Sequence, residues 1–336
     1  MSSITRRGFV AGASAFASIG ILRFPASAAE FTYKYANDNP LTHPMGQAAT
    51  WWADRVKQES GGQMEIQVFP ASQLGTDPEM LTQLRSGGIQ FAHFSAAVLS
   101  TLVPVATIDE VGFAFPTYKV VWEAMDGDLG GYVRGAVEKT GLHIFDRIFD
   151  NGFREITTST RAVNKPDDLK GLKLRIPPAK LYVSMFQTLG ASPTAISIAE
   201  VYSALQTKVV DGQENPLVII ENSKFYEVQK YCSLSNHFWS GFWLVGNGPA
   251  WQRLPKKLQD IVARNYDAAV MRERAQFKQL NDSLQPTLAS QGMTFSKPDV
   301  EAFRAALRQG RFYSQWRDTF GPQAWSKLEK YAGKLV

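Results

Sequence analysis

The sequence has almost no cysteine, since Cys232 is the single one among 336 residues. One thiol can form neither an internal disulfide framework nor a multi-cysteine metal site. Histidine is also scarce: His43, His93, His143 and His237 are the only four, and they lie too far apart for the local spacing of metal ligands. We therefore expect no metal site.

The common catalytic motifs are absent as well. The sequence contains no His-Glu-x-x-His, no Gly-x-Ser-x-Gly, no Walker loop and no Gly-x-Gly-x-x-Gly. Asp126-Gly127-Asp128 is similar to the start of a calcium loop but lacks the later ligands, so we expect a surface turn there. These absences argue against an enzyme without excluding one.

Neither sign of charge is in large excess, with 36 Lys and Arg against 31 Asp and Glu. The 44% hydrophobic content can bury a large core in one or two domains, which excludes a disordered or fibrous protein. The net charge of +5 would suggest an acidic partner. However, Arg6, Arg7 and Arg23 supply three of these charges within the first 28 residues, which contain no acid. The remainder is too small to indicate a nucleic-acid partner.

Long uncharged runs are confined to the N-terminus. Thr5-Arg6-Arg7-Gly8-Phe9 has the paired arginines of a twin-arginine export signal, and Ala26-Ser27-Ala28 has the pattern of a cleavage site. The 15 uncharged residues from Gly8 to Leu22 are fewer than the ~20 of a membrane-spanning helix. We predict a signal peptide at 1–28 and a periplasmic mature protein; an uncleaved anchor is the alternative.

Strand and helix patterns alternate along the rest of the chain. Alternating apolar residues predict strands at 31–35, 64–68, 89–94, 142–149 and 172–175. Helical spacing of apolar residues predicts helices at 44–60, 78–86, 180–189, 199–207 and 255–292. This order is typical of an α/β protein, which binds ligands at the carboxyl ends of its strands. The last helix is long enough to extend over two lobes, and residues 312–336 are amphipathic.

Two segments contain the residues with recognisable chemistry. In the first, which runs from 152 to 177, Arg175 ends a predicted strand two residues before the proline pair Pro177-Pro178. Such a position reaches a cleft, although a surface salt bridge is the ordinary alternative. The second segment contains Asp211-Gly212-Gln213-Glu214-Asn215-Pro216. Gly212 suggests a tight turn, and the proline favours an extended Asn215.

Together these segments closely resemble the extracytoplasmic solute-binding proteins of TRAP transporters, the DctP-like family. The resemblance covers nearly all of the predicted mature chain, including 31–37, 69–75, 167–177 and 200–216. It implies an α/β fold, a two-lobed periplasmic-binding-protein clamp with strands crossing between the lobes and one long bracing helix. The lobes implied are 29–151 plus 241–280 for lobe I and 152–240 plus 281–336 for lobe II.

The resemblance also implies which residues bind the solute. Arg175 matches the arginine that grips a carboxylate in the family, Arg154 matches a second arginine, and Asn215 matches an amide that binds the same carboxylate. A guanidinium fork suits this task because it pairs with both carboxylate oxygens. Lobe I is expected to supply specificity through four further residues, namely Asn37, His43, Asp77 and Ser95.

Other positions bear on which acid is bound. Sialic-acid-binding members of the family have an acidic residue and an arginine where this chain has Ser95 and Val98, which disfavours sialic acid. Ile198 replaces an aromatic residue in lobe II. Trp239 or Phe242 is expected against the body of the ligand, with lobe packing as the alternative. The expectation is an aromatic or apolar monocarboxylate, by a small margin over a sugar acid or a dicarboxylate.

The function implied by the resemblance is capture of a solute. An organic acid anion would bind between the lobes and favour the closed clamp, which would deliver it to the TRAP membrane permease. This process requires no cofactor, and we expect a monomer. Two alternatives remain, a periplasmic enzyme using Glu200 or Asp211 as acid or base, and a solute sensor for a signalling receptor.

Overall fold

The computed structural model describes residues 29–336, so the predicted signal peptide and its arginine pair lie outside the described residues. Its strands are β1 (Phe31–Ala36), β2 (Met64–Phe69), β3 (Phe91–Ser95), β4 (Leu142–Thr158), β5 (Lys173–Ile176), β6 (Ser192–Ala195), β7 (Gly212–Pro216), β8 (Tyr231–Asn247) and β9 (Thr294–Ser296). In the described chain all of them join one sheet of order β2-β1-β3-β8-β4-β7-β5-β6, in which β9 also pairs with β8.

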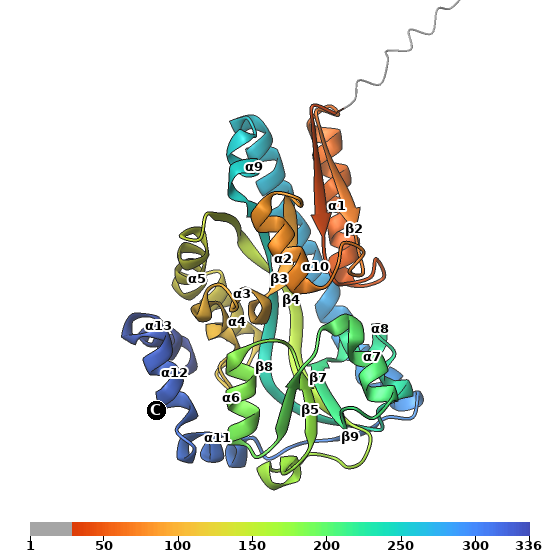
Figure 1. Ribbon diagram of the computed structural model, residues 1–336, viewed down its shortest axis with the longest axis vertical. Coiled ribbons are helices and arrows are strands. Elements are labelled where there is room, and N and C mark those ends of the chain that lie inside the picture. Colours follow the sequence, from red (N-terminus) through yellow and green to blue (C-terminus); the bar gives the residue numbers. More distant parts are fainter. Residues whose placement is uncertain (1–28) are drawn as a thin grey trace, which may run out of the picture.

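Helices cover both ends of this sheet (Figure 1). They are α1 (Pro44–Glu59), α2 (Asp77–Ser86), α3 (Ala96–Leu99), α4 (Tyr118–Met125), α5 (Asp128–Glu138), α6 (Lys180–Thr188), α7 (Ile198–Gln206), α8 (Leu217–Asn222), α9 (Gly248–Arg253), α10 (Lys256–Ser290), α11 (Val300–Gln309), α12 (Phe312–Phe320) and α13 (Pro322–Ala332). Three short 3-10 helices are η1 (Pro104–Glu110), η2 (Pro166–Leu169) and η3 (Phe225–Glu227). No helix of the described chain is both long and apolar enough to cross a membrane.

Two long strands connect the two halves of the molecule. Figure 1 shows β4 and β8 running side by side through both halves, where β8 pairs with β3 at one end and with β9 at the other. Their antiparallel register shifts between Asp150 and Gly152, opposite Gly241 and Ser240. A shift of this kind bends a strand and increases its twist. The chain therefore crosses between the halves at a local irregularity in a continuous sheet, as the predicted crossing strands require.

Gly152 occupies the bend in β4, and its backbone needs glycine. Its φ of 100° is strained for any other residue, and an added Cβ would lie 3.0 Å from Cε1 of Phe277 in α10. We expect Gly152→Ala to lower the free energy of unfolding by about 1–3 kcal/mol in chemical denaturation. Gly135→Ala is the control, because Gly135 lies inside α5 with open space around it and should gain stability. Equal effects of the two variants would contradict this account.

The 35-residue helix α10 braces the crossing strands from behind. It contacts α1 and β4 towards its N-terminal end and α8 and β9 further along the chain. The amphipathic C-terminal segment forms α12 and α13, and both helices pack against η1. In addition, α12 packs against α6, and α13 packs against α4 and α5. The long helix confirms the sequence prediction, and the C-terminal helices contact elements of both predicted lobes.

Two predicted features differ in the structure. The strand expected at 142–149 continues to Thr158 as β4, because its second half pairs with β7 as well as with β8. Gly212 begins β7 instead of forming a tight turn. Glycine suits this strand position because an added Cβ would lie 2.3 Å from the carbonyl oxygen of Thr157 in β4. The close approach of β7 to β4 explains why position 212 is glycine, and no local sequence pattern predicts such a contact.

Candidate ligand-binding site

A cavity lies between the two halves of the molecule, where strands from both halves end. Its lining residues are Asp38, Asp77, Ser95, Val98, Asn151, Arg154, Arg175, Pro177, Pro178, Ile198, Asn215, Ile219 and Phe242. The cavity has a volume of about 30 Å³, which holds one or two water molecules. An organic acid therefore fits only after the two sides move apart or their side chains rearrange. The hydrogen bond from Thr42 to Asn222 links the two halves in this contracted arrangement.

Arg175 projects into the cavity from β5 with its guanidinium fork free. Its Nε donates to the carbonyl oxygen of Ile196 at 2.8 Å, whereas no described residue accepts a hydrogen bond from its two terminal nitrogens. The side chain is buried, and burial lowers its pKa to about 10, although Glu214 raises it and Arg154 lowers it further. A buried guanidinium whose two terminal nitrogens are both unused is suited to bind a carboxylate.

Arg154 is held by the protein itself. Its Nε donates to Oε2 of Glu214 at 2.5 Å, and its Nη2 donates to Oε1 of the same residue at 2.8 Å and to Oδ1 of Asn215 at 3.1 Å. Burial alone would lower the pKa of Arg154, but Glu214 more than offsets it and the pKa is raised. Arg154 thus lines the cavity as half of a neutralised pair, while Arg175 carries the positive charge available to a ligand.

A buried polar network supports this pair from behind. Nε2 of His237 lies 3.1 Å from Oε2 of Glu214, and Nδ1 of His237 lies 2.7 Å from the Ser235 hydroxyl. Burial lowers the pKa of His237, so the imidazole is neutral at pH 7. Burial raises the pKa of Glu110 to about 7, and the charge of Arg154 opposes this shift. Arg154 is therefore fixed in position by fully buried groups.

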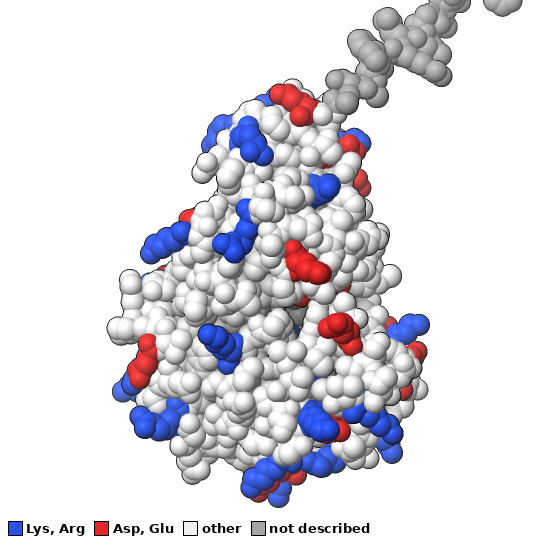
Figure 2. Space-filling model, in the orientation of Figure 1, with Lys and Arg blue, Asp and Glu red and all other residues white. Residues whose placement is uncertain are grey.

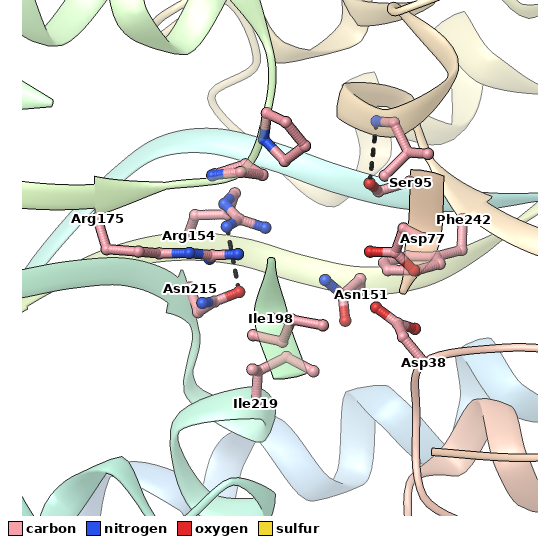
Figure 3. A pocket seen from close by; sticks show the side chains of 13 residues that line it. Asp38, Asp77, Ser95, Asn151, Arg154, Arg175, Ile198, Asn215, Ile219 and Phe242 are labelled. Carbon is pink, nitrogen blue, oxygen red and sulfur yellow. Dashed lines mark hydrogen bonds between the residues drawn. The ribbon is translucent and has the colours of Figure 1, made fainter. Parts of the chain in front are cut away.

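The opposite wall carries carboxyl groups. Figure 3 shows Asp38 and Asp77 across the cavity from Arg154, Arg175 and Asn215. Burial raises the pKa of Asp77 to about 6 against the opposing charge of Arg175, and burial together with the charge of Asp77 raises the pKa of Asp38. The cavity is thus cationic on one side and carboxyl-lined on the other.

Asn151 lies in the middle of the same cavity. It comes from the bend in β4 and is buried, and its Oδ1 has no hydrogen-bond partner in the described chain. An unsatisfied buried amide oxygen is unfavourable by about 1–3 kcal/mol. A hydroxyl or amino group of a ligand would satisfy it.

The raised pKa of Asp77 predicts a pH-dependent stability. The folded-state pKa of about 6 exceeds the ~3.9 of an unfolded aspartate. Ionisation of Asp77 therefore lowers the free energy of unfolding as the pH rises from about 4 to about 6, and the loss persists above pH 6. Asp77→Asn is therefore expected to raise the free energy of unfolding by about 2–3 kcal/mol at pH 8 and to change it little at pH 4. Thermal melts at both pH values check this. Asp54→Asn, at an exposed position of α1, is the matched control.

Seven of the ten residues predicted to bind the ligand line the cavity. They are Arg175, Arg154, Asn215, Asp77, Ser95, Ile198 and Phe242. Ser95 also caps α3, since its hydroxyl accepts from the Val98 amide. The structure brings these residues together from β3, β4, β5, β7, β8, α2 and α7, whose order along the sheet is not visible in the sequence.

The other three predicted residues lie outside the cavity lining. Asn37 uses its side chain to accept from the Asn39 amide and to donate to the Tyr35 hydroxyl. His43 caps the N-terminus of α1 by accepting from the Met45 amide. Both are buried structural residues, so the polar positions after β1 stabilise the loop itself.

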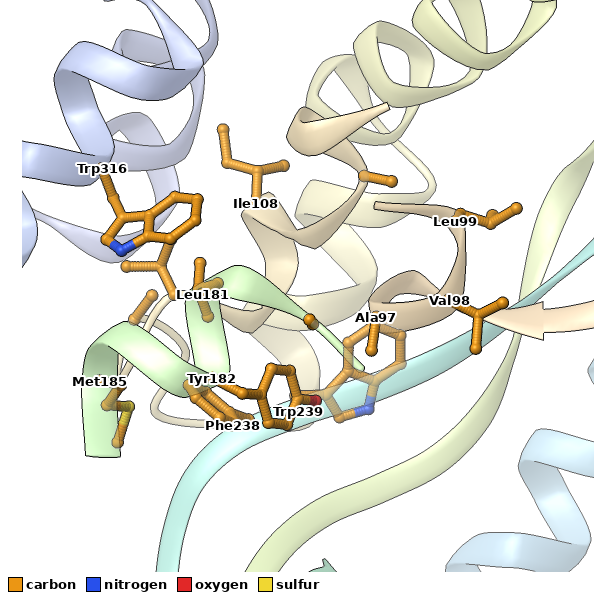
Figure 4. Packing of buried hydrophobic residues seen from close by; sticks show 14 of the residues in the cluster. Ala97, Val98, Leu99, Ile108, Leu181, Tyr182, Met185, Phe238, Trp239 and Trp316 are labelled. Carbon is orange, nitrogen blue, oxygen red and sulfur yellow. The ribbon is translucent and has the colours of Figure 1, made fainter. Parts of the chain in front are cut away.

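Trp239 faces away from the cavity, in the core shown in Figure 4. Its Nε1 donates to Oδ1 of Asp150 at 3.0 Å, and its ring packs edge-on against Trp122. Phe242 lies three residues later and lines the cavity. Successive side chains of a strand point to opposite faces, so residues an odd number of positions apart do not share one. Lobe packing, the alternative, therefore applies to Trp239.

Sequence reasoning missed Asp38, Asn151 and Ile219. Asp38 directly follows Asn37 after β1, so attention to the neighbouring acid could have found it. Asn151 is placed in the cavity by the bend in β4, and Ile219 by the helix that follows β7. The sequence carried no signal for either residue.

The acid–base residues considered for an enzyme lie outside the cavity. Glu200 is exposed, and the Asp211 carboxylate accepts from the Lys173 amide. In the described residues no group of His, Cys, Asp and Glu could hold a metal ion.

A model of the bacterial extracellular solute-binding proteins, family 7, matches residues 35–313. The chain belongs to this family. The sialic acid-binding periplasmic protein SiaP of Vibrio cholerae is 33% identical over 282 residues, which cover 84% of this chain and 87% of SiaP. The resemblance to TRAP solute-binding proteins is thereby confirmed, and the family consists of binding proteins of transporters.

Solved structures of family 7 proteins share the fold. A TRAP solute-binding protein from Sulfurospirillum deleyianum with bound succinate has a TM-score of 0.84 and 30% identity, covering 90% of this chain and 99% of that one. The sugar acid-binding protein DctPAm from Advenella mimigardefordensis, in complex with galactonate, has a TM-score of 0.86 and 28% identity, covering 91% and 98%. The two-lobed α/β clamp expected from the sequence is confirmed.

Charges on the surface of this family 7 protein show no large region of one sign on the visible face. In Figure 2 basic and acidic side chains are interspersed around a central hollow. The electrostatic feature that stands out is internal, at the cavity between Arg175 and the two aspartates.

Proposed function

We propose that this protein is the solute-binding component of a TRAP transporter and that it captures a small hydroxylated monocarboxylate. The observation that carries the proposal is the free guanidinium fork of Arg175 at one end of the cavity, facing the carboxyls of Asp38 and Asp77. The fork would pair with the solute carboxylate, and Asn215 would donate beside it. The carboxyls would bind hydroxyl groups at the other end of the solute.

The preference for an aromatic or apolar acid is not supported. It rested on Trp239 and Phe242, and only Phe242 lines the cavity. The acids named for the three relatives, sialic acid, succinate and galactonate, are all polar. A second carboxylate would meet Asp77, whose negative charge disfavours it above about pH 6. We therefore place a sugar acid before a dicarboxylate.

Titration calorimetry at about pH 8 with galactonate and succinate tests this proposal. We expect galactonate to bind with one site per chain and at least tenfold more tightly than succinate, and to be recovered unchanged after incubation. Tighter binding of succinate would overturn the proposed solute class. Turnover of the acid, or no binding across a panel of hydroxy acids, sugar acids and dicarboxylic acids, would overturn the proposed function.

Two features of the chain support a clamp mechanism. The proposed lobes, 29–151 plus 241–280 and 152–240 plus 281–336, meet at the strand irregularity opposite Ser240 and Gly241. The contracted cavity requires a more open form to admit the solute. A solute that contacts both lobes would favour closure, because it gains these contacts only in the closed form. We propose that the protein is a monomer exported to the periplasm by the twin-arginine route. Its closed form would deliver the acid to the permease.

A further inference from the structure

A second cavity lies on the other side of the crossing strands. It has a volume of about 380 Å³ and lies among β4, β8, α4, α8 and α10. Its wall on β4 consists of Phe153 and Glu155, the two neighbours of Arg154. Because side chains alternate along a strand, Arg154 lines the solute cavity while its neighbours line this one. The second cavity is therefore separate from the solute site.

Glu155 is a buried carboxyl without a cationic partner in the described chain. It is 4% exposed, and its Oε2 accepts from the Asn236 amide at 3.0 Å. In the described chain its carboxyl is bound by backbone amides, and no Lys, Arg or His forms an ion pair with it. Burial raises the pKa of Glu155 to about 8, opposed by the backbone amides of Asn236 and Ser235. A buried carboxylate of this kind is stabilised by a cation.

Further groups around the cavity attract positive charge. The phenol of Tyr118 lines the cavity, and its pKa is raised by burial and by the carboxyls of Asp150, Glu155 and Glu273. Arg274 opposes the raised pKa of Asp150 and Glu273 but has no such effect on Glu155, and its terminal nitrogens bind Asp126 at 2.7 and 2.9 Å. Of these acids only Glu155 lines the cavity, and no arginine in the described chain pairs with it.

The rest of the lining indicates the kind of cation. The rings of Tyr118 and Phe153 meet edge to face at 5.0 Å, and aromatic faces attract ammonium groups. Asn281 donates to the Tyr118 hydroxyl at 3.1 Å, which leaves its own amide oxygen to accept. Leu217 and Leu234 supply apolar surface. Calcium prefers six to eight oxygen ligands, with several carboxylates, which this lining lacks.

We propose that this cavity binds a small primary ammonium ion with a short aliphatic body. The ammonium group pairs with Glu155 and donates to the amide oxygens of Asn281 and Gln285. The body of the amine lies against Leu217 and Leu234. Gln285 is exposed, so the amine enters from solvent beside α10. This site does not depend on the proposed solute, because none of its residues lines the solute cavity.

Titration of the full mature chain with n-propylammonium chloride at about pH 9 tests the proposal. At this pH Glu155 is ionised, and a primary amine with a pKa of about 10.4 is still protonated. We expect saturable binding in the millimolar range, at least tenfold weaker in Glu155→Gln and unchanged in Glu138→Gln, an exposed glutamate of α5. n-Propanol, which has the same body without the charge, should not bind.

A second variant keeps the test independent of the folding of Glu155→Gln. Gln285→Lys places an ammonium on an exposed turn of α10 beside the cavity, and we expect it to abolish n-propylammonium binding. Absence of saturable binding to the parent protein, or equal binding to the parent and Glu155→Gln, would overturn the proposal. Sodium or calcium chloride that bound in place of the amine would also overturn it, in favour of a metal site.

Discussion

Arg175→Ala is expected to lower the affinity for galactonate by at least 100-fold. The two free terminal nitrogens of Arg175 would each donate to the solute carboxylate, and a hydrogen bond to a charged group contributes about 1.5–3 kcal/mol. Two such bonds correspond to at least a factor of about 100 in the dissociation constant. Arg175→Lys should recover only part of this loss, because an ammonium cannot form the paired contact.

The fold of Arg175→Ala should be preserved. Arg175 is a buried cation with a single protein hydrogen bond, so its removal relieves an unfavourable burial and the melting temperature should stay equal or rise. Calorimetry measures the affinity and a thermal melt measures the fold. Arg308→Ala, at an exposed position of α11, is the control and should change neither. Unaltered galactonate binding by Arg175→Ala would show that the solute is held elsewhere.

Glu214→Gln is expected to lower the free energy of unfolding by about 3–5 kcal/mol. Glu214 is fully buried and binds Arg154 through both carboxylate oxygens, while His237 contacts it from the other side. Loss of its charge leaves Arg154 buried beside a neutral His237 and Glu110, whose pKa of about 7 leaves that carboxyl only partly ionised at pH 7. Removal of one partner from a buried ion pair is costly for this reason.

Chemical denaturation at pH 7 measures this effect against two controls. Glu65→Gln breaks an exposed ion pair with Lys57 and should change stability by about 1 kcal/mol or less. The double variant Arg154→Met with Glu214→Gln removes both charges, and we expect it to be more stable than Glu214→Gln alone. A double variant less stable than the single one would show that packing of Arg154, and not its unpaired charge, causes the loss.

The strand and helix pattern in the first half of the chain was predictable from local sequence. Helix α1 starts at Pro44 and the chain turns at Gly61 and Gly62, as expected, because a proline and two glycines delimit it. The full length of β4 and β8 was not predictable. Pairing with β3, β7 and β9 holds these strands extended, and these partners come from distant parts of the chain.

The two arginines of the site also show what the sequence could predict and what it could not. Arg154 and Arg175 were both predicted to bind the carboxylate, and both line the cavity. Their different roles follow from the partner of each. Glu214 of β7, the strand paired with β4, neutralises Arg154, whereas no described acid forms an ion pair with Arg175. Residue type and spacing identified two guanidinium groups, and burial with a counter-ion distinguished them.

The sequence by itself determined the α/β class, the family, the two arginines and Asn215, because these depend on local periodicity and on short segments of specific residues. Only the tertiary structure decided that Trp239 packs in the core while Phe242 faces the cavity. It also decided that Asp38 and Asp77 oppose Arg175, with Asn151 between them. It also placed Glu155 in a cavity of its own. These outcomes depend on which face of a twisted, bent strand each side chain occupies, and strand pairing over long sequence distances sets that face.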